Sequence, residues 1–236
     1  MNEKNPSHSD LSDEHSWPHP AYAWYVVTVL TIAYTVSFID RQILNLLVEP
    51  IRADLDISDT QISLLQGLAF AIFYSLLGVP IGRLADRSNR RNVIALGIFI
   101  WCLMTAACGL ARNFIQLFIA RIGVGVGEAA LSPPAYSIIA DYFPPERLAR
   151  ATGMYALGVY AGAGIAMLVG GAVIGVISDA EPTYIPYIGL IRPWQLAFIA
   201  VGLPGLLACA LMFTVKEPAR RDTLKDFDTD KESVSF

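Results

Sequence analysis

The sequence has 236 residues, of which 54% are hydrophobic and 16% are charged, with a formal net charge of −4 at pH 7. Its mean hydropathy is +0.48. A soluble domain contains more charge and less apolar material, so this composition argues against one. A soluble helical bundle is disfavoured as well, because uncharged runs of about 20 residues would leave its helices without a solvated face.

Six segments are long and apolar enough to cross a bilayer as helices, which takes about 20 residues each. In chain order they are residues 22–48, 60–82, 93–111, 113–140, 151–178 and 194–215. They predict an all-α membrane protein with six transmembrane helices in one domain, residues 21–215. Residues 1–20, rich in Ser, His, Asp and Pro, predict a disordered cytoplasmic tail. Residues 216–236 predict a second cytoplasmic segment.

The basic residues divide unevenly between the two sides of these spans. One side holds Lys4, Arg83, Arg87, Arg90, Arg91, Arg147, Arg150, Lys216, Arg220, Arg221, Lys225 and Lys231, and the other holds Arg52, Arg112 and Arg192. Cytoplasmic loops carry the excess of Lys and Arg, so both chain ends are expected in the cytoplasm. The chain is therefore predicted to be a multi-pass protein of a plasma membrane, of the bacterial inner-membrane type.

Asp40 and Arg41 stand side by side in the first predicted span, which is otherwise apolar. A charge inside a bilayer is costly and almost always faces a protein interior or an aqueous cavity. Two interpretations stay open from these residues alone. The pair could anchor the helix by reaching toward the outer interface, or it could form a switch in which Arg41 neutralises one of two buried acids.

The second span ends in the stretch GRLADRSNRR, residues 82–91. Asp86 lies near the C-terminal end of this helix, where the macrodipole disfavours a carboxylate. It needs a compensating cation, for which Arg87, Arg90 and Arg91 are within local reach, or the N-terminus of another helix. Gly82, one turn earlier, allows a neighbouring helix to approach closely.

The fourth span carries Arg121 and Glu128, which are two turns apart on one helix face. At 1.5 Å per residue, Arg41 lies about 10 Å and Glu128 about 22 Å below the outer surface. Side chains lean toward the N-terminus of their own helix, so Arg41 extends inward and Glu128 outward, and we expect them to converge. The adjacent Pro133 and Pro134 predict a break in the span just beyond Glu128.

Two of these stretches resemble motifs of the major facilitator superfamily. GRLADRSNRR resembles the G-x-x-x-D-R-x-G-R-R/K loop, with Asn89 where the family usually has glycine, and RIGVGVGEA resembles the R-x-x-x-G-x-G element at Arg121, Gly125 and Gly127. More narrowly, the phrases FIDRQILNLLVEPI, GEAALSPPAYSIIADYF and PPERLARATG resemble the spinster-like branch, whose members export lysolipids and sphingolipids.

The resemblance implies a fold and a set of partners. The six spans would form the N-terminal half of a major facilitator fold, built from two inverted three-helix repeats in which spans one and four are counterparts. Residues 216–236 would begin the central linker to a C-terminal six-helix half. The implied partners are the bilayer and an amphiphilic or anionic small molecule, with no nucleic acid, cofactor or metal, and with a proton gradient as the energy source.

The candidate site residues follow from the buried charges and from the resemblance together. Asp40 and Glu128 are expected to couple transport to protons. Arg41 and Arg121 are expected to bind the substrate, with Tyr34, Phe38 and Tyr136 as an apolar wall. The cytoplasmic gate is expected at Gly82, Asp86, Arg87, Arg90 and Arg91.

The function predicted is secondary active, proton-coupled transport of an amphiphilic lipid by alternating access. One alternative is a proton-coupled symporter of small organic anions. Another is a non-transporting membrane scaffold or receptor-like half-transporter. An enzyme is disfavoured, because the spans contain no Ser-His-Asp or Cys-His arrangement.

Overall fold

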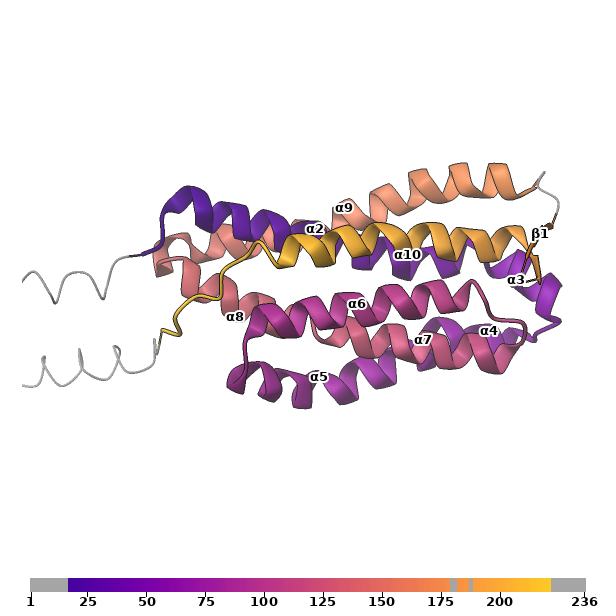
Figure 1. The fold of residues 1–236 in the computed structure, drawn as a ribbon, viewed down its shortest axis with the longest axis horizontal. Helices are drawn as coiled ribbons and strands as arrows, with labels where there is room; N and C mark the ends of the chain where they lie inside the picture. Colours follow the sequence, from indigo (N-terminus) through magenta and orange to yellow (C-terminus); the bar gives the residue numbers. More distant parts are fainter. Residues whose placement is uncertain (1–16, 179–181, 187–188, 222–236) are drawn as a thin grey trace, which may run out of the picture.

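The computed structural model describes residues 17–178, 182–186 and 189–221, and these are almost entirely helical (Figure 1). The elements are α2 (Pro20–Leu46), α3 (Val48–Leu55), α4 (Asp59–Ser63), a π-helical turn η1 (Leu64–Leu68), α5 (Ala69–Arg87), α6 (Arg90–Cys108), α7 (Phe114–Ala129), α8 (Ser132–Tyr142), α9 (Pro145–Ser178), β1 (Thr183–Ile185), β2 (Gly189–Ile191) and α10 (Pro193–Met212). The predicted tail and linker lie largely outside the described residues, in 1–16 and 222–236.

Six helical segments of the described chain are long and apolar enough to cross a membrane. They are Pro20–Leu46, Asp59–Arg87, Arg90–Cys108, Phe114–Tyr142, Pro145–Ala172 and Pro193–Met212. Each overlaps one predicted span, so the predicted all-α membrane fold is confirmed. The second segment joins α4, η1 and α5, and the fourth joins α7 and α8.

The long helices run side by side along one axis, so the bundle has two ends (Figure 1). The start of α2 and the end of α10 lie at the same end, which we call the terminal end. At the other, the distal end, lie α3, α4 and the β1–β2 hairpin. The hairpin pairs Thr183 with Ile191 in the connection between α9 and α10.

Large apolar side chains cover the outside of the bundle. Leu76 on α5 is 66% exposed and Leu168 on α9 is 79% exposed, and Leu103, Ile115 and Leu207 are exposed on other helices. In water such surfaces would drive association. A bilayer solvates them, so they mark the lipid-facing surface or a surface that another membrane domain covers.

Close packing between α6 and α7 depends on glycine. A β-carbon at Gly127 would lie 2.6 Å from the Trp101 backbone nitrogen and 2.7 Å from the Gly97 carbonyl oxygen. Only glycine allows two backbones to approach to this distance. The crossing therefore fixes the position of Glu128, the next residue on α7, against the interior of the bundle.

The fourth span is broken where the sequence predicts it. Helix α7 ends at Ala129, and α8 begins at Ser132 with proline in its first turn. Proline has no amide hydrogen to donate there, and its fixed φ suits a helix start. The break places Glu128 in the last turn of α7.

Candidate functional site

Three ionisable side chains meet in the interior of the bundle. Asp40 on α2 and Arg121 on α7 are each 2% exposed, and Glu128 on α7 is fully buried. Arg41, beside Asp40, completes a set of two carboxylates and two guanidinium groups whose formal charges cancel.

Arg41 and Glu128 form an ion pair. Nε of Arg41 lies 2.5 Å from Oε2 of Glu128. The Ser37 hydroxyl donates to the same oxygen at 2.8 Å. The predicted convergence of these two side chains is therefore confirmed. A guanidinium paired with a fully buried carboxylate does not fit the alternative in which Arg41 only anchors α2 at the interface.

Asp40 is held separately from this ion pair. The Thr105 hydroxyl on α6 donates to Oδ2 of Asp40 at 2.7 Å, and Arg121 and Glu128 are within electrostatic range of the same carboxylate. Among the described residues, Oδ1 of Asp40, Oε1 of Glu128, and Nε and Nη1 of Arg121 have no hydrogen-bond partner. Unpartnered buried polar atoms reduce stability, so this cluster is not arranged for stability alone.

Aromatic rings surround the Arg41 guanidinium. Its Cζ lies 5.1 Å from the Phe38 ring centroid, 4.5 Å from that of Phe70 and 5.1 Å from that of Tyr74. These distances lie within the range of cation–π attraction. Phe38 comes from α2, whereas Phe70 and Tyr74 come from α5.

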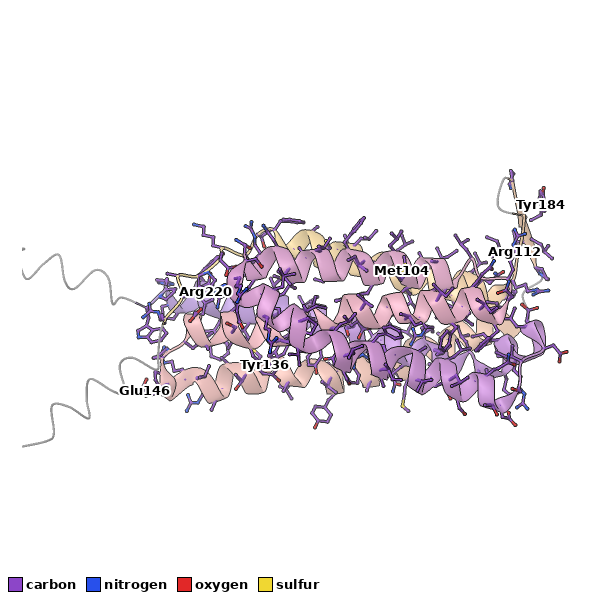
Figure 2. The ribbon with its side chains drawn as sticks, turned by 90° about the horizontal axis from the view of Figure 1, so that it is seen from below. Met104, Arg112, Tyr136, Glu146, Tyr184 and Arg220 are labelled. Atoms are coloured by element: carbon purple, nitrogen blue, oxygen red, sulfur yellow. The ribbon has the colours of Figure 1, made fainter. Side chains whose placement is uncertain are left out.

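The three aromatic residues predicted as a wall lie in one chain of ring contacts. Tyr34 contacts Phe38 edge-on at 5.8 Å and stacks on Tyr155 of α9 at 4.7 Å. Tyr136 contacts Tyr155 edge-on at 5.1 Å. Tyr136 is 43% exposed, and Figure 2 shows it on the side of the bundle toward the terminal end. Tyr155 therefore joins the wall to α9.

The predicted gate residues do not pair with one another. Arg90, the first residue of α6, is buried and binds Asp141 on α8 at 2.5 Å and Glu217, beyond α10, at 2.7 Å. The Arg91 backbone N–H also donates to Glu217. The expectation that these arginines compensate Asp86 is wrong for Arg90, because its guanidinium points inward to carboxylates of other segments.

Asp86 and Arg87 are exposed at the terminal end, and Asp86 has no ion pair with any described residue. Arg220 instead donates to the carbonyl oxygens of Ala85 and Ser88 at 2.8 and 3.0 Å. It thereby caps the C-terminal end of α5 with positive charge, and Figure 2 shows it at this end. Gly82 faces α8, where its β-carbon would be 3.9 Å from Pro133.

Five residues that contact the buried charges or the aromatic wall were not predicted from the sequence. They are Ser37, Phe70, Tyr74, Thr105 and Tyr155. Ser37 lies one turn before Arg41 on α2, so helical spacing could have indicated it. The other four lie in the second, third and fifth spans, which contain no charged residue. Nothing in a local pattern separates them from ordinary core residues.

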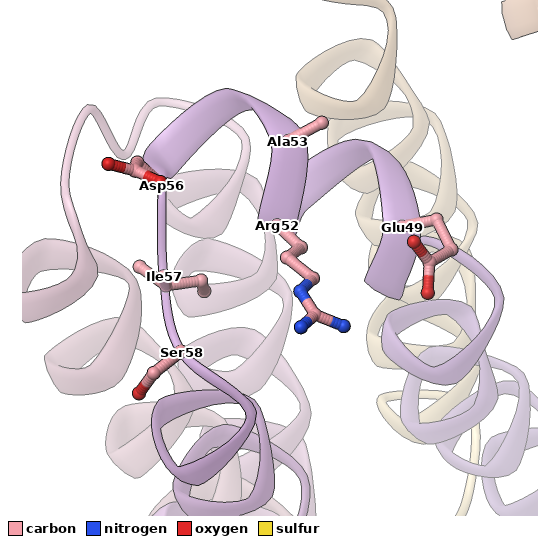
Figure 3. Close-up of a pocket in the computed structure, with 6 residues that line it drawn as sticks. All are labelled: Glu49, Arg52, Ala53, Asp56, Ile57 and Ser58. Carbon is pink, nitrogen blue, oxygen red and sulfur yellow. The ribbon is translucent and has the colours of Figure 1, made fainter.

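A hollow of about 540 Å³ opens at the distal end, away from the aromatic wall (Figure 3). It is lined by Glu49, Arg52, Ala53, Asp56, Ile57 and Ser58. Arg52 pairs with the exposed Asp59 at 2.8 Å. The charged side chains that line this hollow are exposed, whereas Asp40, Arg121 and Glu128 are buried.

The sequence matches the family described as the Major Facilitator Superfamily over residues 30–235. It is 30% identical over 207 residues to an MFS-type efflux pump of Mycolicibacterium smegmatis, covering 88% of this chain and 44% of the pump. It is also 30% identical over 178 residues to a probable L-galactonate transporter of Escherichia coli, covering 75% of this chain and 36% of that protein.

Its fold matches the crystal structure of a bacterial homolog to the human lysosomal transporter Spinster, in an inward-facing and unoccupied conformation. The TM-score is 0.77 and the identity 37%, covering 91% of this chain and 50% of that one. The chain thus spans about half the length, or less, of these relatives. It belongs to the major facilitator superfamily, resembles its spinster members, and has the fold of the N-terminal six-helix half.

Proposed function

We propose that this chain is the N-terminal half of a secondary active transporter that moves an amphiphilic lipid, such as a lysolipid or a sphingolipid, by alternating access. Transport is coupled to protons, and a C-terminal six-helix half supplies the second wall of the cavity. The transporter holds no cofactor, and its chemistry is binding and proton transfer rather than catalysis.

The observation that carries this proposal is the Arg41–Glu128 ion pair beside the buried Asp40. In the proposed mechanism the Arg41 guanidinium serves Glu128 and Asp40 in turn. In the position seen here Arg41 binds Glu128, and the buried Asp40 is left with Thr105 and Arg121 as its neighbours. Taking up a proton removes the charge of the acid that Arg41 does not bind. Movement of Arg41 from Glu128 to Asp40 therefore exchanges which acid holds the proton, and this couples proton binding to conformation.

A lipid substrate is supported by the surroundings of Arg41. Its side chain is 24% exposed, so part of the side chain is open to a substrate. The rings of Tyr34, Phe38 and Tyr136 provide an apolar wall for the rest of an amphiphile. The likeness to a bacterial Spinster homolog agrees with the resemblance of the sequence to the spinster-like branch, from which a lipid substrate is expected.

The alternative substrate is a small organic anion. The probable L-galactonate transporter is 30% identical to this chain, and a planar guanidinium binds carboxylates in bidentate fashion. A scaffold or receptor-like half-transporter is the alternative from another class. This alternative does not account for the charges buried in the interior of the bundle.

The proposed orientation places the terminal end in the cytoplasm. Single cysteines introduced at Ser9 and Lys225 are expected to react with an impermeant thiol reagent only from the cytoplasmic side, and one at Thr183 only from the opposite side. The three native cysteines are buried and serve as the unlabelled background. Labelling of the Ser9 variant from the outer face would reverse the orientation.

Transport is tested in proteoliposomes that contain this chain alone or together with the C-terminal half of the bacterial Spinster homolog. We expect no uptake by the chain alone, because it supplies only one of the two walls of the proposed cavity. With both halves, we expect a labelled lysolipid to become protected from extraction by external albumin, faster under a proton gradient.

A labelled sugar acid in the same vesicles separates the two substrate classes. Uptake of the sugar acid without the lysolipid would favour the organic-anion alternative. Saturable uptake by the chain alone would show that the second half is not required. Absence of any flux from the paired halves would support the scaffold.

A further inference from the structure

Two aromatic residues of α5 lie against Arg41 outside the predicted substrate wall. Phe70 and Tyr74 are one turn apart, and their rings stack at 5.3 Å with an interplanar angle of 22°. Together with Phe38 they contact the guanidinium through three rings. Phe70 is the nearest of the three, at 4.5 Å.

The rings of Phe38, Phe70 and Tyr74, which we call the aromatic cage, stabilise one position of Arg41. Ring faces attract a cation, most strongly where water is excluded. The rings of α5 contact Arg41 in the conformation in which its Nε binds Glu128 at 2.5 Å. Asp40, the other acid, is bound by Thr105 on α6 instead. The α5 rings thus favour the position beside Glu128, and departure from Glu128 would give up their attraction.

The π-helical turn η1 sets the direction of Phe70. It covers Leu64–Leu68, directly before α5. A π turn holds one more residue than an α turn, and each residue of helix corresponds to about 100° of rotation. Ile62, just before the turn, and Leu65, within it, are buried in the core. The extra residue lets these two face the core while Phe70 faces Arg41.

Contact between α5 and α7 sets the position of Phe70 along the axis of the bundle. A β-carbon at Gly125 would lie 3.0 Å from the Phe70 carbonyl oxygen and 3.3 Å from its Cα. Gly125 therefore lets α5 approach α7 less than one turn before Glu128. The same glycine that matches the family motif lets Phe70 of α5 lie close to α7, at a point near in sequence to the acid that Arg41 binds.

We propose that Phe70 and Tyr74 are positioning residues that hold the Arg41 guanidinium on Glu128, so that α5 controls when Arg41 is released. The geometry of the cage stands by itself. Its consequence for transport rests on the proposed function, in which Arg41 moves between Glu128 and Asp40.

The test reads the position of Arg41 directly by NMR of the whole chain, labelled at arginine, in lipid nanodiscs. The Arg41 Nε–H signal is assigned by its loss in Arg41→Lys. We expect ring currents to displace this signal from those of exposed arginines, and hydrogen exchange to be slow. In Phe70→Leu the signal should move toward the exposed arginines and exchange roughly tenfold faster, because the nearest ring is lost.

The controls separate a ring effect from a general loss of packing. Phe70→Tyr keeps a ring and should retain the parent signal. Phe99→Leu makes the same substitution on α6 at a side chain that is 50% exposed, and it should also retain the signal. If Phe70→Leu does not fold, the half-buried Tyr74→Leu decides in its place.

An Arg41 signal that stays unchanged in the folded leucine variant would overturn the proposal. So would a Phe70→Tyr variant whose Arg41 signal moves and exchanges as it does in Phe70→Leu. Neither outcome depends on transport, so failure of the transport assay leaves this result intact.

Discussion

Replacing Arg41 by alanine is expected to lower the free energy of unfolding of the chain by about 3 kcal/mol. The substitution leaves Glu128 fully buried without its cation, and loss of one partner of a buried pair typically costs about 3–5 kcal/mol. The lower end applies because the Arg41 side chain is 24% exposed. Unfolding by a denaturing detergent in mixed micelles, followed by circular dichroism, measures the change.

A double-mutant cycle provides the control. Glu128→Gln removes the charge but keeps the size of the side chain and a hydrogen-bond acceptor for Ser37. The double variant Arg41→Ala/Glu128→Gln should be more stable than Arg41→Ala, because no lone charge remains buried. If the two single effects simply add, the ion pair does not contribute in the way its geometry indicates.

Asp40→Asn is expected to abolish the response of transport to a pH gradient. Asparagine can still accept the hydrogen bond from Thr105, but it cannot exchange a proton. Uptake by the paired halves in proteoliposomes should then be equal with and without an imposed gradient, while substrate exchange at equal pH persists. Arg41→Lys should be impaired in both assays, because an ammonium lacks the planar fork of the guanidinium.

Thr105→Val is the matched control for this experiment. It keeps the Asp40 carboxyl group and removes the hydroxyl that binds it. The gradient response should survive in this variant with a shifted pH optimum, as also expected for Glu128→Gln. If Asp40→Asn responds to the gradient as the parent does, Asp40 takes no part in proton coupling and the switch must be reassigned.

The spans and the break in the fourth one are visible in the sequence because their causes are local. The thickness of the bilayer sets the length of a crossing helix, and inside it every backbone group must be bonded within its own segment. Pro133 and Pro134 suit the first turn of a helix better than its interior, and α7 ends at Ala129 just before α8 begins with them in its first turn. Buried charges are equally visible, because Asp40 and Glu128 have no solvated alternative inside a span.

What the sequence by itself determined, then, is the six-helix architecture and the set of charges in its interior, including the convergence of Arg41 with Glu128. Their depths follow from residue counts along straight helices. The tertiary structure alone decided the neutral partners, namely Thr105 on Asp40 and the rings of Phe70 and Tyr74 on Arg41. It also directed Arg90 to Asp141 and Glu217 rather than to Asp86. A threonine or a phenylalanine in an apolar span looks like any packing residue. Which side chain it meets depends on the rotation and spacing of neighbouring helices, and here the π-helical turn and the glycines at the crossings set both.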